Sequence, residues 1–242
     1  NGVTDFLQHI VYTFQLYKAI SLRFSKCLKQ TGDDVHLIDL CSGGGGPWMS
    51  LIDDMEKQFT ARRSLRVTLT DLYPNINAFK QAQSKFPQIS FSELAIDATK
   101  VPEELKGFRT LFSSFHHLMP EQAQAVIQDA VDAKTGIAIF ESTQRHPLML
   151  LYMLFTPILV WLNTPFIRPF SWSRLFWTYI APLIPLVVMF DGIVSCLRTY
   201  TVDELQNMVG QLNANDYSWD IGLEKISFLP IGVTYLIGTP KK

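Results

Sequence analysis

The first regular pattern in the chain is a set of apolar residues that recur at three- and four-residue steps. They are Phe6, Ile10, Phe14, Tyr17, Ile20, Phe24 and Leu28. This spacing places their side chains on one face of a helix. It predicts a single amphipathic helix over residues 4–29, capped by Thr4 and ended by Gly32.

Short apolar runs and helical patterns then alternate. The runs predict strands at residues 35–40, 65–70, 89–96, 108–113, 136–140, 218–226 and 233–238, and the patterns between them predict helices at residues 47–59, 75–86, 121–133 and 201–212. Thr201 and Glu204 have the spacing of a capping box at the start of the last helix. Strands that alternate with helices favour a mostly parallel sheet covered on both faces. We therefore expect one α/β domain over residues 1–242.

The alternation is interrupted at residues 143–200. Two stretches there, 147–167 and 175–190, contain no charged residue. The first has about the length of a membrane span, but prolines at 157, 165, 182 and 185 shorten every straight helix. Three interpretations stay open: a membrane hairpin, a buried helical subdomain or dimer interface, and a helical lid over an apolar acceptor, with contact to a membrane surface as an option. The lid is favoured, because insertions after the fifth strand lie where α/β sheets bind ligands.

Charge and cysteine content narrow the function classes. The net charge of −1 gives no basic field for nucleic acid, so no nucleic-acid partner is expected. The three cysteines are odd in number and widely spaced, which argues against a disulfide framework and a structural zinc. We expect no metal and a reducing, cytoplasmic setting, with peripheral membrane contact as an option.

A glycine-rich segment follows the first predicted strand. It reads Asp39-Leu-Cys-Ser-Gly-Gly-Gly-Gly-Pro47. Glycines let a backbone turn sharply and approach a ligand closely, and the following helix N-terminus favours an anionic group. Four consecutive glycines before a proline do not fit the GxGxxG spacing of dinucleotide loops. Asp39 suits a cationic partner instead, such as an amino acid's ammonium group, directly or through water.

This segment resembles motif I of class I S-adenosylmethionine (SAM)-dependent methyltransferases, D-x-G-x-G-x-G, with Cys41 in place of the first glycine. The resemblance covers residues 35–141. It implies SAM as cofactor and a Rossmann-like, mostly parallel seven-stranded sheet with helices on both faces. Asp71 and Asp97, which close the second and third strands, would take the ribose hydroxyls and the adenine amino group. The implied cofactor-binding residues are Asp39, Cys41, Ser42, Gly43, Gly45, Asp71, Leu72, Asp97, Ala98 and Ser114.

Candidates for proton handling and acceptor binding come from later segments. His116 or His117 could act as a base, since histidine titrates near neutrality, or could be structural. Glu141 could orient an acceptor amine or hydroxyl, or pair with Arg145. Arg198 and Tyr200 could bind an anionic acceptor group, or Arg198 could pair with Asp191. The aromatic residues of the insertion, Trp161 and Trp177 among them, would form an apolar roof.

The expected function is therefore methyl transfer from SAM to an O, N or C atom of a hydrophobic small molecule or lipid-like acceptor. Two alternatives stay open. The protein could use SAM for a non-methylating reaction or a structural role, or it could be a membrane-associated module with a vestigial site. The sequence does not identify the oligomeric state.

Overall fold

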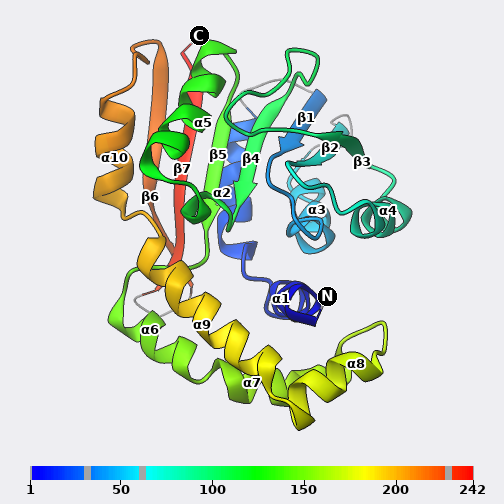
Figure 1. The fold of residues 1–242 in the computed structure, drawn as a ribbon. Helices are drawn as coiled ribbons and strands as arrows, with labels where there is room; N and C mark the ends of the chain where they lie inside the picture. The colour runs from blue at the N-terminus through cyan, green and yellow to red at the C-terminus, as the bar shows by residue number, and fades with distance from the viewer. Residues whose placement is uncertain (1, 30–33, 60–63, 227–230, 242) are drawn as a thin grey trace.

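The computed structural model describes residues 2–29, 34–59, 64–226 and 231–241. Their centre is a seven-stranded sheet in the order β3-β2-β1-β4-β5-β7-β6 (Figure 1). All strands run parallel except β7, which is antiparallel to both of its neighbours. The strands are β1 (Asp34–Asp39), β2 (Ser64–Asp71), β3 (Ile89–Ala95), β4 (Phe108–Phe112), β5 (Ile137–Glu141), β6 (Tyr217–Lys225) and β7 (Gly232–Pro240). The predicted mostly parallel α/β sheet is confirmed.

Helices cover both faces of this sheet because its strand side chains alternate between two apolar cores. On β5, for example, Phe140 belongs to one core and Ile139 to the other. The first core is covered by α2 (Lys18–Leu28), α3 (Trp48–Glu56) and α4 (Ile76–Lys85). The second is covered by α5 (Pro120–Asp132) and α10 (Val202–Gly210). The capping box predicted for α10 is present, with Thr201 and Glu204 bonded to each other's backbone amides.

The N-terminal segment forms two helices, so the prediction of one continuous helix is wrong. The chain breaks after α1 (Gly2–Phe14), where Gln15 has a left-handed φ of 47°. The apolar stripe is continuous across the break, but its two halves pack in different places. Phe6 of α1 packs against the insertion, whereas Ile20 and Phe24 of α2 pack on the sheet. Thr4 lies inside α1 and does not cap it, and Gly32 is outside the described residues.

The insertion between β5 and α10 is helical. It contains α6 (Pro147–Leu154), α7 (Thr156–Asn163), α8 (Trp172–Leu175), a π-helical turn (Phe176–Ile180) and α9 (Leu183–Arg198). Figure 1 shows these helices beyond the carboxyl ends of the parallel strands, with α1 beside them. A small apolar core joins α1 to α7 and α9, and it includes Phe6, Val160 and Val188. We call residues 147–198 together the helical lobe.

The lobe also carries a buried charged side chain. Arg174 is bonded to Asp5 of α1, with 2.8 Å between Nη1 and Oδ2. Its other guanidinium nitrogen, Nη2, donates to the carbonyl oxygens of Ile167 and Pro169. One arginine therefore fixes the connector between α7 and α8 and ties the lobe to α1. No single helix in the described residues is long and apolar enough to cross a membrane, although two bent helix pairs in the lobe meet the criteria of length and composition.

Candidate active site

The segment after β1 folds as a tight loop whose backbone requires glycine. Gly43, Gly45 and Gly46 have φ values of 54°, 107° and 63°, which few side chains tolerate. A Cβ on Gly46 would lie 3.0 Å from Oδ2 of Asp39. Cys41, which occupies the first glycine position of the motif, also has a positive φ of 55°. The loop therefore keeps the conformation of a glycine motif at this cysteine, with some backbone strain.

Asp39 lies behind this loop rather than in front of it. Its side chain is 1% exposed, and its two oxygens accept hydrogen bonds from Thr110 Oγ1 at 2.8 Å and Ser42 Oγ at 2.7 Å. Burial raises the pKa of Asp39 to about 6, although these hydroxyls act in the opposite direction. Asp39 and Ser42 therefore hold the loop in place, and neither presents its side chain openly to a ligand.

Two further carboxylates stand at the same edge of the sheet. Asp71 ends β2 and accepts hydrogen bonds from the amides of Gly43 at 2.8 Å and Tyr73 at 2.9 Å, so it joins the second strand to the glycine loop. Asp97 follows β3, is exposed, and caps a short turn by accepting from Thr99. Beside them, Leu72 is exposed and Ala98 is buried. The carboxyl ends of β1, β2 and β3 thus each carry an aspartate, as the sequence predicted.

Ser114 and its neighbour Ser113 follow β4. The Ser114 hydroxyl is buried and has no hydrogen-bond partner among the described residues. Ser113 has a left-handed φ of 44°, and its Oγ lies 2.5 Å from Oη of Tyr17 and 2.8 Å from Oγ of Ser142. The sequence did not identify Tyr17, Ser113 or Ser142 as site residues, because hydroxyls scattered over α2, β4 and β5 have no local motif.

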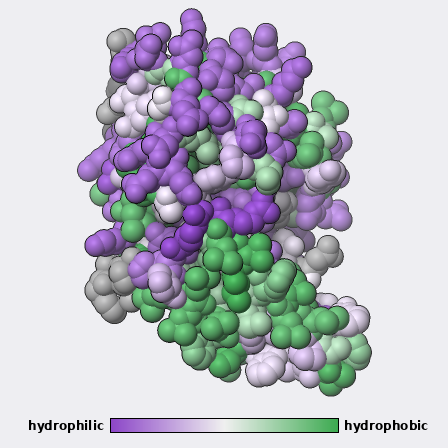
Figure 2. Space-filling view, turned by 60° about the vertical axis from the view of Figure 1, so that its left-hand side comes forward, coloured by the Kyte–Doolittle hydropathy of each residue, from purple (hydrophilic) through white to green (hydrophobic). Residues whose placement is uncertain are grey.

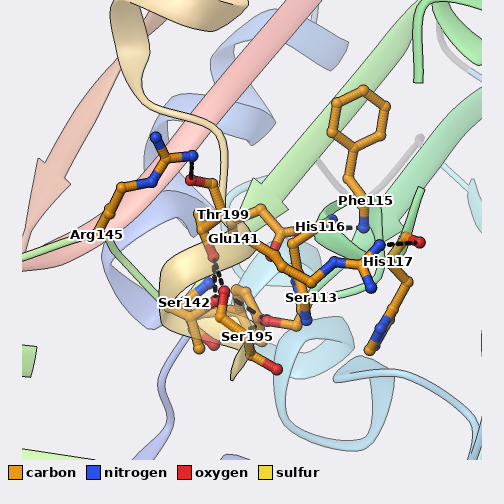
Figure 3. Close-up of polar contacts among 12 residues, drawn as sticks. Ser113, Phe115, His116, His117, Glu141, Ser142, Arg145, Ser195 and Thr199 are labelled. Carbon is orange, nitrogen blue, oxygen red and sulfur yellow. Dashed lines mark hydrogen bonds and ion pairs between the residues drawn. The ribbon is translucent and has the colours of Figure 1, made fainter. Parts of the chain in front are cut away.

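The strongest polar contact at this edge joins His116 to Glu141. Nδ1 of His116 lies 2.6 Å from Oε2 of Glu141, and both side chains are buried (Figure 3). The other carboxylate oxygen accepts from the amides of Phe115 at 2.8 Å and His116 at 3.3 Å. Nε2 of His116 has no hydrogen-bond partner among the residues that the structure describes. Because a carboxylate accepts, Nδ1 is the donor in this pair, and Nε2 is the ring nitrogen left for another group.

Of the two alternatives for Glu141, the pairing with Arg145 is absent from the described residues. Arg145 instead contacts Glu204 Oε1 at 3.0 Å and the Thr199 carbonyl oxygen at 3.1 Å. Glu141 is buried and accepts hydrogen bonds from the His116 ring and from two backbone amides.

Arg198 and Tyr200 both contact the backbone of the turn that follows β4. Arg198 Nη2 donates to the carbonyl oxygen of His117 at 2.8 Å, and Tyr200 Oη donates to that of Leu118 at 2.9 Å. Within the described chain, no ion pair joins Arg198 to Asp191. Both side chains therefore fix the turn that carries the two histidines. His117 itself is exposed, and partial burial is the main cause that lowers its pKa.

Trp161 and Trp177 lie on the lobe, where both are exposed. Trp161 Nε1 donates to the carbonyl oxygen of Thr178, which ties α7 to the π-helical turn. The cavity nearest the glycine loop has a volume of about 610 Å³ and lies between α1, α4 and the connector at residues 166–169, with Gly44 in its wall. Gln8 of α1 donates to the Gly44 carbonyl oxygen. Among the described residues, no group of three or more His, Cys, Asp or Glu side chains could hold a metal.

No known family model and no curated protein sequence matches this chain. Solved structures do. The plantazolicin methyltransferase BpumL, in complex with a pentazolic desmethylPZN analog and SAH (S-adenosylhomocysteine), is 11% identical over 99% of this chain and 90% of its own, with a TM-score of 0.61. The methyltransferase domain of bacterial CtHen1 is 13% identical over 94% of this chain and 100% of its own, with a TM-score of 0.53.

A Rhodobacter sphaeroides protein provisionally named a zinc-dependent alcohol dehydrogenase is also similar, at 11% identity over 94% of this chain and 97% of its own, with a TM-score of 0.53. Similarity at this level of identity shows the fold and not the reaction. The chain has the class I SAM-dependent methyltransferase fold.

Proposed function

We propose that this protein transfers a methyl group from SAM to a hydrophobic small molecule or lipid-like acceptor. The observation that carries the proposal is the set of polar side chains at one sheet edge. Three aspartates end β1, β2 and β3 around a glycine loop, and the His116–Glu141 pair stands at the ends of β4 and β5. A cofactor site and a proton acceptor thus lie on neighbouring strands of the same edge, where such sheets bind ligands.

The residues at this edge fit SAM. Asp71 is only partly buried, and its oxygens can accept from the ribose hydroxyls beside the Gly43 amide. Asp97 is exposed and can accept from the adenine amino group. The buried Ser114 hydroxyl lacks a partner and is suited to a polar group of the methionine part. Asp39 does not contact the ammonium group of SAM directly. It favours that group through its negative charge and by holding the glycine loop in place.

When bound, SAM supplies a methyl group on a positively charged sulfur, which is already an activated donor. The protein's own chemical task is then to position the acceptor and to remove a proton from it. Nε2 of His116 accepts that proton. Glu141 keeps the proton on Nδ1, orients the ring, and stabilises the imidazolium that forms. Buried carboxylate–imidazole pairs fix a histidine tautomer in this way.

The apolar nature of the acceptor is inferred from the helical lobe. Arg198, at the end of α9, holds the His117 carbonyl oxygen, so the lobe is anchored beside the proposed base. Its connector shares a cavity wall with Gly44 of the loop. A cover that is largely apolar beside the reacting centre favours apolar acceptors, which gain free energy by leaving water.

The proposal is tested by incubating the protein with methyl-labelled SAM and two matched panels of acceptors, one of apolar phenols, quinols and fatty acids and one of polar analogues. We expect label in apolar products, and release of S-adenosylhomocysteine in equal amount. Transfer only to polar acceptors would contradict the acceptor class. Binding of SAM without transfer to any acceptor would favour a non-methylating role.

A further inference from the structure

The helical lobe exposes an unusual amount of apolar surface. Of twenty-eight exposed large apolar side chains in the described part of the chain, twenty lie between residues 147 and 198. They come from α6, α7, α8, the π-helical turn, α9 and the segments that connect them. In Figure 2 much of the lobe is coloured as hydrophobic, whereas the body above it is largely hydrophilic. Monomeric soluble proteins rarely expose continuous apolar areas of this kind without a partner.

The lobe does not need this surface for its own packing. Its inner side is already formed by buried residues such as Met149, Val160 and Val188, which pack within the lobe and on α1. Arg174 adds a buried anchor to Asp5. The exposed side chains are therefore additional to the buried contacts that hold the lobe to α1.

The charges and aromatic residues of the lobe are of the kind found at lipid surfaces. None of the chain's 22 acidic residues lies between residues 142 and 190. The basic residue Arg168 is exposed there, next to Phe170 and Trp172. Exposed tryptophan and tyrosine side chains, Trp161, Trp177 and Tyr179 among them, add rings that combine an apolar body with a polar tip. Such rings and arginines concentrate at the boundary between lipid chains and headgroups.

We propose that the helical lobe docks the protein onto the surface of an anionic lipid bilayer, with its exposed apolar side chains among the outer parts of the acyl chains. The lobe lies in the interface and does not span it. Its two apolar helix pairs are bent by 47° and 78°, which leaves short helices that can lie along a surface. Binding of this kind scales with apolar area and with attraction to anionic headgroups. This inference rests on the lobe's surface alone and does not require the proposed reaction.

A second copy of the chain is the competing occupant. In a symmetric contact between two lobes, each Arg168 would meet a surface that has no carboxylate between residues 142 and 190. Anionic headgroups supply negative charge across a whole surface, whereas a second lobe offers only the carboxylate of Asp191. Charge complementarity therefore favours the bilayer.

The test is flotation of the full chain with vesicles of phosphatidylcholine, and with vesicles of an equal mixture of phosphatidylcholine and phosphatidylglycerol. One variant combines Leu162→Ser, Trp172→Ser, Ile180→Ser and Phe190→Ser, whose side chains are between 64% and 78% exposed. Leu94→Ser, on β3 and 74% exposed, is the matched control away from the lobe. We expect wild type and control to float with anionic vesicles, and the fourfold variant to partition at least about tenfold more weakly.

A second experiment separates the contribution of charge to vesicle binding from that of apolar contact. Arg168→Gln should weaken binding to the anionic vesicles by about fivefold, and binding to pure phosphatidylcholine much less. Far-ultraviolet circular dichroism and thermal unfolding should show that the fourfold variant keeps its fold. The proposal is overturned if wild type floats with neither vesicle, or if the folded fourfold variant floats as well as wild type. It is also overturned if light scattering shows a dimer that this variant dissociates, with no vesicle binding by wild type.

Discussion

The sheet edge and the helical lobe depart from ordinary protein architecture in opposite directions. At the edge, carboxylates and an imidazole are buried: Asp39, Glu141 and His116 are all nearly inaccessible to solvent. On the lobe, tryptophans, phenylalanines and leucines face outward. A globular domain usually buries the second group and exposes the first. Both departures cost stability, which indicates that each region is built for a partner outside the chain, one polar and one apolar.

The first prediction tests the edge where the largest effect is expected. His116→Gln should lower methyl transfer by roughly 10²–10⁴-fold, because it removes the proposed proton acceptor. The affinity for SAM should change little, since no cofactor contact is lost. The measurement is the initial rate with the best acceptor from the labelled-methyl panel, together with calorimetric binding of SAM.

His117→Gln is the matched control, because His117 is adjacent, exposed and not bonded to Glu141. It should retain most of the activity. Equal losses in both variants, or in neither, would contradict the assignment of the base to His116. Glu141→Gln should reduce the rate by a smaller factor than His116→Gln, because the imidazole would lose its carboxylate partner but keep Nε2.

The second prediction concerns the free energy of unfolding and Asp39. Burial raises its pKa from the ordinary value of 3.8 to about 6, so the folded protein binds this proton more tightly than the unfolded chain. Its contribution to stability is therefore present below pH 4 and is lost as the pH rises through about 6. The loss should be on the order of 3 kcal/mol. Urea unfolding at several pH values should show that Asp39→Asn lacks this contribution.

The Asn variant should also bind SAM more weakly, because the negative charge behind the loop is gone. A variant that is as stable or more stable at neutral pH, yet binds SAM less well, would show that the buried carboxylate is retained for the ligand. Parallel pH profiles for wild type and variant would contradict the account of Asp39.

The third prediction tests the half-buried carboxylate at the end of the second strand. Asp71→Ala should weaken SAM binding by about 1.5–3 kcal/mol, because two ribose hydroxyls would lose their acceptor. Glu103→Ala removes an exposed carboxylate elsewhere and should leave the affinity unchanged. The measurement is isothermal titration of both variants with SAM. If Asp71→Ala binds SAM as tightly as Glu103→Ala does, Asp71 is not part of the ribose site.

The fourth prediction has the smallest effect and concerns the lobe. Leu162→Ser should change the free energy of unfolding by no more than about 0.5 kcal/mol, because its side chain is 64% exposed and little packing is lost. Leu37→Ser, at a fully buried position of β1, should cost several times more. Urea unfolding of the two variants measures the difference. A large loss for Leu162→Ser would mean that this face is covered in solution.

Much of the fold could be predicted from the sequence because strand and helix patterns are local. The seven strands, the aspartates at the ends of three of them, and the capping box of α10 all follow from short-range spacing. The break at Gln15 could not be predicted in this way. The apolar residues keep the same helical spacing before and after Gln15. The turn is needed only because Phe6 packs in the core of the lobe and Ile20 packs in the core of the sheet.

The hydrogen-bond partners of the polar site residues could not be predicted from the sequence either. Glu141 is four residues from Arg145 but pairs with His116, twenty-five residues away, because β4 and β5 are neighbouring parallel strands that end together. Arg198 is seven residues from Asp191 but reaches the backbone of His117. The sequence predicted several of the side chains that meet at the edge, but their pairing is set by strand order.

The central claim is that the sheet edge is a SAM site, and it can be measured without knowing the acceptor. Calorimetric titration of the wild-type protein with S-adenosylhomocysteine and, separately, with NAD⁺ compares the two ligand classes that similar α/β folds bind. The account predicts saturable binding of S-adenosylhomocysteine in the micromolar range and no binding of NAD⁺. Binding of NAD⁺ instead, or no saturable heat with S-adenosylhomocysteine, would contradict it.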